Sequence, residues 1–118
     1  VEIKVVRFDS CQHFYATVLA PLLIELKWSD ETAAGFGLMG SDHVGFLIER
    51  GQQGASCHLA FRADDAPQVD AFHHAGIKAG FACNGLPGLR SHYAPNYYAA
   101  FLRDPDGNNI EAVCHNAE

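Results

Sequence analysis

The sequence predicts an α+β fold, in which two βαβββ modules form a curved mixed sheet, a cup, with helices on its convex face. Three observations predict it. A strand, a helix and three further strands occur twice in the 118 residues, and the polar stretch 51–55 separates the two copies. At an offset of 58 residues, apolar positions of the two copies coincide: Val1 with Leu59, Ile3 with Phe61, Val5 with Ala63, Phe14 with Phe72, and Leu19 with Ile77. We therefore expect a single domain over 1–118, with module one at 1–50 and module two at 56–118.

In module one, the strand predicted at 1–8 alternates between apolar residues and the charged Glu2 and Lys4, which share one face. Asp9 is the expected N-cap of a helix over 9–20, because short polar side chains can bond the free N–H groups of a first turn. Apolar residues recur at helical spacing through that segment. The remaining strands of this module are predicted at 23–30, 34–40 and 43–50.

Module two repeats this order from a strand at 57–63, in which His58 and Arg62 lie opposite the apolar residues. A helix is expected over 66–79 and a short strand over 81–84. The Gly- and Pro-rich segment 85–96 then predicts a loop. The final segment, 97–114, predicts two strands joined by a tight turn at Asp104-Pro105-Asp106-Gly107.

Composition narrows the possible partners. The net charge of −6 and the scattered basic residues argue against nucleic acid, because phosphate binding requires clustered Lys and Arg. No apolar run is long enough to cross a bilayer, so no membrane partner is expected. The four cysteines form no C-x-x-C pair, and we expect them to be reduced, which indicates a cytoplasmic protein. A small molecule is the expected partner.

One carboxylate requires an explanation. In the last strand, Ile110 and Ala112 lie on the apolar face, so Glu111 lies on the opposite face in mid-strand. Two interpretations remain open from this stretch alone: a solvated outer face, or a ligand inside a concave site. The repeat places further polar side chains on the same, concave side of the sheet. They are Glu2, Lys4, His58 and Arg62.

Several motifs together resemble the vicinal oxygen chelate superfamily, which includes glyoxalase I, bleomycin-resistance proteins, fosfomycin-resistance enzymes and extradiol dioxygenases. The resemblance extends over nearly the whole chain and is strongest after residue 56. It specifies the fold much better than the reaction. The residues that carry it are Phe14-Tyr15, Val18 to Leu22, His58 to Phe61, Val69 to His73, Asn84 to Arg90, Tyr97 to Phe101 and Asp104 to Val113.

The resemblance implies a divalent metal (Ni, Zn, Mn or Fe) held in the cup by residues on the first and last strands of each module. His58 and Glu111 match two ligand positions, and Glu111 would also serve as the catalytic proton shuttle. The module-one equivalent of His58 falls before Val1. Near the equivalent of Glu111, Gly45 and Leu47 cannot bind metal, and Glu49, which shares their parity, lies near the end of the strand. Without metal, His58 is a core histidine and Glu111 pairs with Arg62, Lys4 or another donor.

Two classes of function therefore remain open. The first is a metal-dependent enzyme that acts on a small oxygenated substrate by isomerisation, thiol addition or oxygenation. The second is a metal-free protein that binds and sequesters an apolar or cationic drug, as bleomycin-resistance proteins do. The resemblance also implies a homodimer. The candidate substrate-binding residues are Glu2, Lys4, Arg62, Arg90 on the loop, and Tyr97 and Tyr98, of which alternation lets only one reach the cup.

Overall fold

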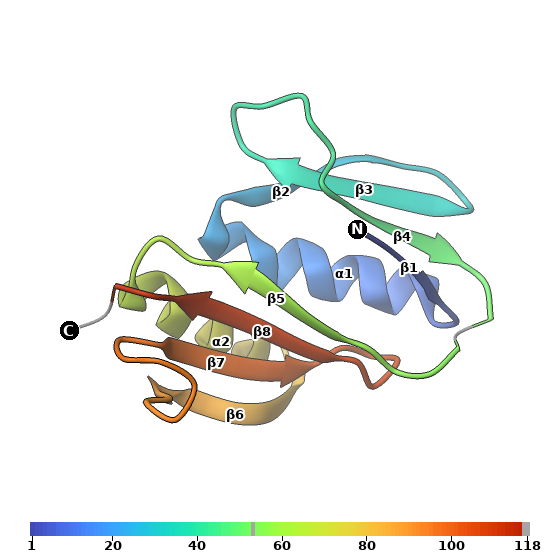
Figure 1. The fold of residues 1–118 in the computed structure, drawn as a ribbon. Coiled ribbons are helices and arrows are strands. Elements are labelled where there is room, and N and C mark those ends of the chain that lie inside the picture. Colours follow the sequence, from blue (N-terminus) through green and yellow to red (C-terminus); the bar gives the residue numbers. More distant parts are fainter. Residues whose placement is uncertain (53, 117–118) are drawn as a thin grey trace.

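The computed structural model describes residues 1–52 and 54–116, so Gln53 of the predicted linker lies outside the described residues. Its elements follow the predicted order (Figure 1). Within the described residues, no helix is long and apolar enough to cross a membrane. Module one contains β1 (Glu2–Val5), α1 (Phe8–Leu19), the 3-10 turn η1 (Ala20–Leu22), β2 (Ile24–Ser29), β3 (Ala33–Leu38) and β4 (Phe46–Arg50). Module two contains β5 (His58–Arg62), α2 (Ala66–Lys78), β6 (Ala82–Leu89), β7 (Tyr98–Arg103) and β8 (Asn109–Cys114).

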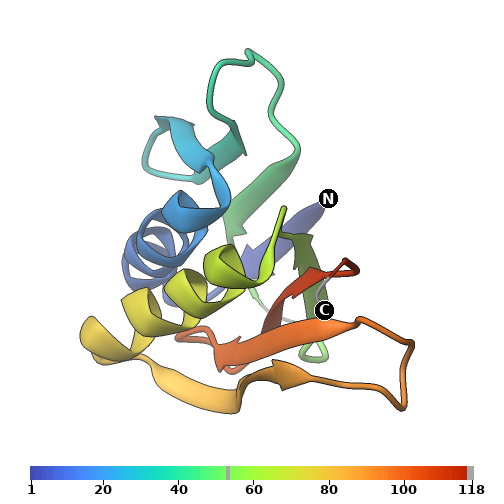
Figure 2. The same ribbon diagram turned by 90° about the vertical axis from the view of Figure 1, so that its left-hand side faces the viewer.

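The two modules have the same sheet topology. The strand order is β1-β4-β3-β2 in one four-stranded sheet and β5-β8-β7-β6 in the other. In each sheet the first and last strands of the module pair in parallel, and the other pairs are antiparallel. The two helices contact each other and lie on the same side of the sheets (Figure 2). The predicted α+β fold with two βαβββ modules is confirmed.

The strand registers identify equivalent positions in the two modules. In β1 and β4, Glu2 lies opposite Leu47, and in β5 and β8, Ala60 lies opposite Glu111. Since Glu2 and Ala60 are 58 residues apart, the repeat found in the sequence makes Leu47 the equivalent of Glu111. An apolar side chain thus occupies the place in module one that a carboxylate occupies in module two.

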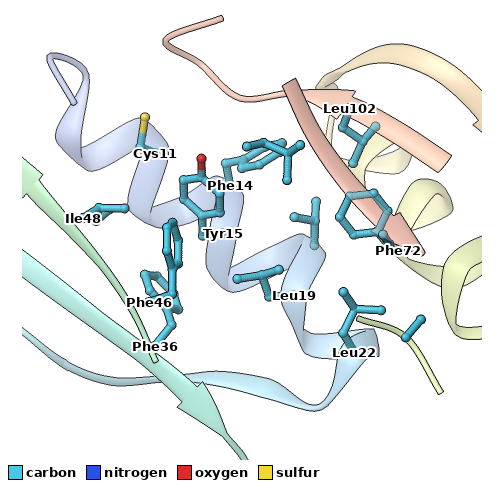
Figure 3. Close-up of a cluster of buried hydrophobic side chains, with 14 of the residues drawn as sticks. Cys11, Phe14, Tyr15, Leu19, Leu22, Phe36, Phe46, Ile48, Phe72 and Leu102 are labelled. Atoms are coloured by element: carbon cyan, nitrogen blue, oxygen red, sulfur yellow. The ribbon is translucent and has the colours of Figure 1, made fainter. Parts of the chain in front are cut away.

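A single apolar core joins the two modules. Residues from both helices and both sheets belong to it, including Phe14 and Phe36 of module one and Phe72 and Leu102 of module two (Figure 3). Aromatic rings meet edge to face within it, as between Tyr15 and Phe46, whose ring centroids are 4.9 Å apart. The core therefore fixes the helices against the sheets and leaves the other face of each sheet available for a site.

The start of α1 differs from the prediction. The helix begins at Phe8, so the predicted strand 1–8 ends early and Asp9 lies in the first helical turn rather than at the N-cap. Instead, Asp106 in the turn before β8 caps the start of α1. Its carboxylate is fully buried and accepts hydrogen bonds from the N–H groups of Val6 at 2.6 Å and Arg7 at 3.1 Å. Module two thus supplies the acceptor at the start of the first helix.

Part of the predicted loop is a strand. We expected a short strand at 81–84 followed by a loop over 85–96, but β6 continues to Leu89 and pairs with β7. Its register shifts between Cys83 and Gly85 and again between Gly85 and Gly88. Such irregularities accommodate Gly and Pro in a strand, and they explain why composition alone indicated a loop.

Candidate functional site

The candidate site lies on the face of the β5–β8 sheet that α2 does not cover, which we call the open face. Ala99, Phe101 and Val113 form a small hydrophobic cluster there, separate from the main core. Glu111 of β8 shares this face and is 1% exposed. A carboxylate buried to this degree requires hydrogen-bond donors, because desolvation of an unpaired charge is costly.

Two side chains form hydrogen bonds with the Glu111 carboxylate. The Nε2 atom of His58 lies 2.7 Å from Oε1, and the hydroxyl group of Tyr97 donates to Oε2. The parallel register of β5 and β8 brings His58 beside the carboxylate, and Tyr97 reaches it from the residue before β7. Glu111 is covered, whereas the His58 side chain is 53% exposed. His58, Tyr97 and Glu111 thus form a connected triad whose imidazole faces solvent.

Electrostatics support this arrangement. Burial, the hydrogen bond to the Glu111 carboxylate and the charge of that carboxylate together raise the pKa of Tyr97 to about 12. The phenol therefore stays protonated at neutral pH and remains a donor. A phenolate at this position would face the carboxylate at close range, which like-charge repulsion disfavours.

The segment after β6 borders the triad. The guanidinium of Arg90 lies over the Phe101 ring, 5.4 Å from its centroid, and donates to the carbonyl groups of Gly88 and Leu86 at 2.8 and 2.7 Å. The rings of Tyr93 and Tyr97 lie 5.0 Å apart, centroid to centroid. Arg90 is thus near the triad, but its hydrogen bonds are directed to its own loop.

The other predicted residues lie elsewhere. Glu2 and Lys4 are on β1 in the other sheet, and Lys4 forms an exposed ion pair with Glu49 at 3.8 Å. Tyr98 lies on the α2 side, where its hydroxyl donates to Asp70 at 2.6 Å. Of the two adjacent tyrosines, Tyr97 is therefore the one on the open face. Neither Lys4 nor Arg62 provides the pairing predicted for a metal-free Glu111, because His58 and Tyr97 occupy its oxygens.

A second feature is an apolar cavity of about 320 Å³, which we call the inter-sheet cavity. It lies between β3 and β4 of one sheet and β5 of the other. β5 contributes Leu59 and Phe61 from the face opposite His58, together with Arg62. Phe36, Phe46 and His43 line it from module one. Arg62 is a candidate from the sequence, whereas Phe36 and Phe46 are not, since apolar strand positions carry no signal that distinguishes a cavity wall from a filled core.

Comparison with known proteins identifies the family. No protein-family model matches the sequence, and no curated protein matches it. Among solved structures, a glyoxalase/bleomycin resistance protein from Albidiferax ferrireducens T118 is 31% identical with a TM-score of 0.79, over 100% of this chain and 96% of that chain. A lactoylglutathione lyase from Agrobacterium tumefaciens is 19% identical with a TM-score of 0.70, over 96% of this chain and 89% of its own.

A further structure has the same fold. A glyoxalase/bleomycin resistance protein/dioxygenase family enzyme from Burkholderia phytofirmans PsJN is 18% identical with a TM-score of 0.70, over 96% of this chain and 94% of that chain. At such identities the likeness of this structure and the lyase concerns the fold alone. The higher identity to the first structure, over the full length of this chain, extends the likeness to the sequence. The chain belongs to the glyoxalase/bleomycin resistance protein family, within the vicinal oxygen chelate superfamily.

Proposed function

We propose that this protein binds a small, largely apolar molecule without a metal, and that the inter-sheet cavity is its binding site. The cavity carries the proposal. Its volume of about 320 Å³ falls at the lower end of the range typical of ligand pockets. Aromatic and aliphatic side chains dominate its lining, and Ser41, His43 and Arg62 supply the polar ones. Such a lining suits an apolar body with one polar group.

Arg62 indicates the charge of that polar group. Within the described part of the chain, no hydrogen bond or ion pair engages its guanidinium. A guanidinium is a strong donor to carboxylates and phosphates, often through two parallel hydrogen bonds. The favoured ligand is therefore an apolar molecule with an acidic group, rather than the cationic drug that the sequence left open.

Calorimetric titration with octanoate and octylamine tests this proposal, because these probes share one chain length and carry opposite charges. We expect octanoate to bind more tightly, and Arg62→Gln to weaken octanoate by about tenfold while leaving octylamine unchanged. Gly45→Phe should block both, since a Cβ at Gly45 meets only His43 ring atoms at 3.9 Å and the ring can extend into the cavity. Gly54→Phe, at a glycine with open space around it, is the matched control. Saturable binding by neither probe, or equal binding to Gly45→Phe, would contradict the proposal.

A metal-dependent enzyme is the second candidate, and the 2.7 Å approach of His58 to Glu111 favours it. The superfamily usually binds a divalent metal. The residues present do not complete such a site: no group of three or more His, Cys, Asp or Glu side chains occurs within the described residues. Leu47 occupies the module-one equivalent of Glu111, and both Glu111 oxygens already accept hydrogen bonds. Metal-free binding is therefore the first candidate.

Titration of the metal-stripped protein with Ni, Zn, Mn and Fe(II) separates the candidates. We expect the wild type, His58→Ala and Glu111→Gln to give the same weak isotherms, because the described residues contain no three-ligand site that either substitution could remove. Stoichiometric binding by the wild type that both substitutions abolish would reverse the order of the two candidates. Pairing into a homodimer stays a proposal, motivated by the edge positions of β1 and β5 in their sheets.

A further inference from the structure

A second cluster of reactive side chains lies on the other face of the β5–β8 sheet. Cys83, on β6, is an exposed free cysteine. Its Sγ atom lies 3.1 Å from Nε2 of His73, and the N–H group of Gly85 points at the same sulfur from 3.4 Å. His73 is a buried residue of α2, and Asp70 lies one turn earlier on that helix. A thiol, an imidazole and a backbone donor are therefore held together, away from the triad.

His73 is suited to act as a base toward this thiol. Burial lowers the pKa of its imidazole, the nearby Asp70 carboxylate partly opposes this shift, and His74 adds to it. The ring is consequently neutral at physiological pH, and a neutral imidazole has one nitrogen free to accept a proton. The titratable groups that act on His73 come from α2 itself, Asp70 and His74, and Cys83 faces it from β6.

The other cysteines lack this environment. Cys11 and Cys114 are buried in the core, and burial raises the pKa of Cys11 above its usual range. Cys57 is half-buried, and burial raises its thiol pKa as well. The thiolate is the reactive form of cysteine, so burial, which disfavours the thiolate, suppresses reaction at these positions. Cys83 alone among these four combines exposure with a neighbouring imidazole.

We propose that Cys83 is a site of S-thiolation by low-molecular-weight disulfides, with His73 as its general base. The Sγ proton passes to Nε2 of His73, and the sulfur attacks one sulfur of the disulfide. A new S–S bond forms to Cys83 while the old one breaks, and the departing thiolate takes the proton from the imidazolium. The Gly85 N–H group stabilises charge on the cysteine sulfur before attack. One disulfide and one thiol are thus converted into one mixed disulfide and one thiol.

Reaction with oxidised glutathione, followed by mass spectrometry of peptides, tests the proposal on the ligand-free protein. We expect glutathione on Cys83 well before Cys57, and none on that peptide in Cys83→Ser. At about pH 7, His73→Gln should slow the reaction by about tenfold or more, because a positioned base is lost. His92→Gln, at an exposed histidine on the loop after β6, is the matched control and should retain the wild-type rate. At about pH 10 the rates of the wild type and His73→Gln should converge, since solvent hydroxide then replaces the imidazole as the base.

Two results would overturn the proposal: equal rates at Cys83 and Cys57 in the wild type, or an unchanged rate in His73→Gln at neutral pH. Circular dichroism would show whether His73→Gln unfolds. If it does, the pH dependence of the reaction rate at Cys83 in the wild type tests the role of His73 instead. Catalysis by a neutral imidazole predicts a nearly constant rate from about pH 7 to 8, whereas an unassisted thiol gains about tenfold per pH unit. A tenfold rise would refute the role of His73. Because the thiol chemistry needs neither a cavity ligand nor a metal, its failure would leave the proposed function untouched.

Discussion

Replacing Asp104 by Ala is expected to lower the free energy of unfolding by about 3 kcal/mol or more, because several buried donors lose their acceptor together. Asp104 is 4% exposed. Its carboxylate accepts from the Tyr15 hydroxyl at 2.5 Å, and from the Asn108 amide side chain, the Asn108 N–H and the Asp106 N–H, each at 2.9 Å. The substitution also loosens the turn that presents Asp106 to the start of α1. Urea denaturation monitored by circular dichroism measures the change.

Two comparisons separate this mechanism from a general effect of removing a carboxylate. Asp42→Ala removes the same group from an exposed position and should change the stability by a few tenths of a kcal/mol, roughly the scale of surface substitutions. Tyr15→Phe removes one donor and keeps the ring in the core, so it should cost about 1 kcal/mol. A loss for Asp104→Ala no larger than that for Asp42→Ala would show that the turn does not connect the two modules energetically.

The elements were predictable where a local pattern determines them. The alternation that places Ile110 and Ala112 opposite Glu111, and the helical spacing in 66–79, reflect geometry that each segment imposes on its own side chains. The cap of α1 was not predictable in this way. Asp106 and the Val6 N–H group are 100 residues apart, and Asp9 offered a nearer, plausible acceptor. The capping rule considers only residues next to the helix and therefore selects Asp9, whereas the tertiary structure places Asp106 at the helix start.

In the candidate site too, local patterns predicted some residues, whereas others depend on the tertiary structure. The repeat and the strand parity placed His58 and Glu111 on one face, and the structure brings them into contact at 2.7 Å. The third member is one of two candidates, Tyr97 and Tyr98, and alternation shows only that one of them reaches this face. Which one does so depends on the path of the loop that precedes β7, which no periodicity encodes. The existence of the inter-sheet cavity depends on the distance between the two sheets. That distance is set by the whole core between them, so single residues such as Phe36 carry no sign of it.

Removal of both hydrogen-bond donors of the triad is expected to cause a second large loss of stability. In the double substitution His58→Leu and Tyr97→Phe, both donors to Glu111 disappear, while the apolar replacements keep water away from the carboxylate. We expect a loss of about 3 kcal/mol or more in the free energy of unfolding, as found when a buried charge loses its partners. Each single substitution should cost less, because one donor then remains. Denaturant unfolding of the wild type, the two single variants and the double variant provides the measurement.

Adding Glu111→Met tests whether the uncompensated charge causes that loss. Met resembles Glu in length and shape but carries no charge. In the wild-type background this change leaves the His58 and Tyr97 donors without an acceptor and should destabilise the protein slightly, since the exposed imidazole can turn to water. In the double-variant background the same change removes a buried, unpaired carboxylate and should restore most of the lost stability. A reversal of sign between the two backgrounds is therefore the expected result. If Glu111→Met were equally destabilising in both, the side chain at this position would matter for packing alone, and the hydrogen bonds of the triad would contribute little to the fold.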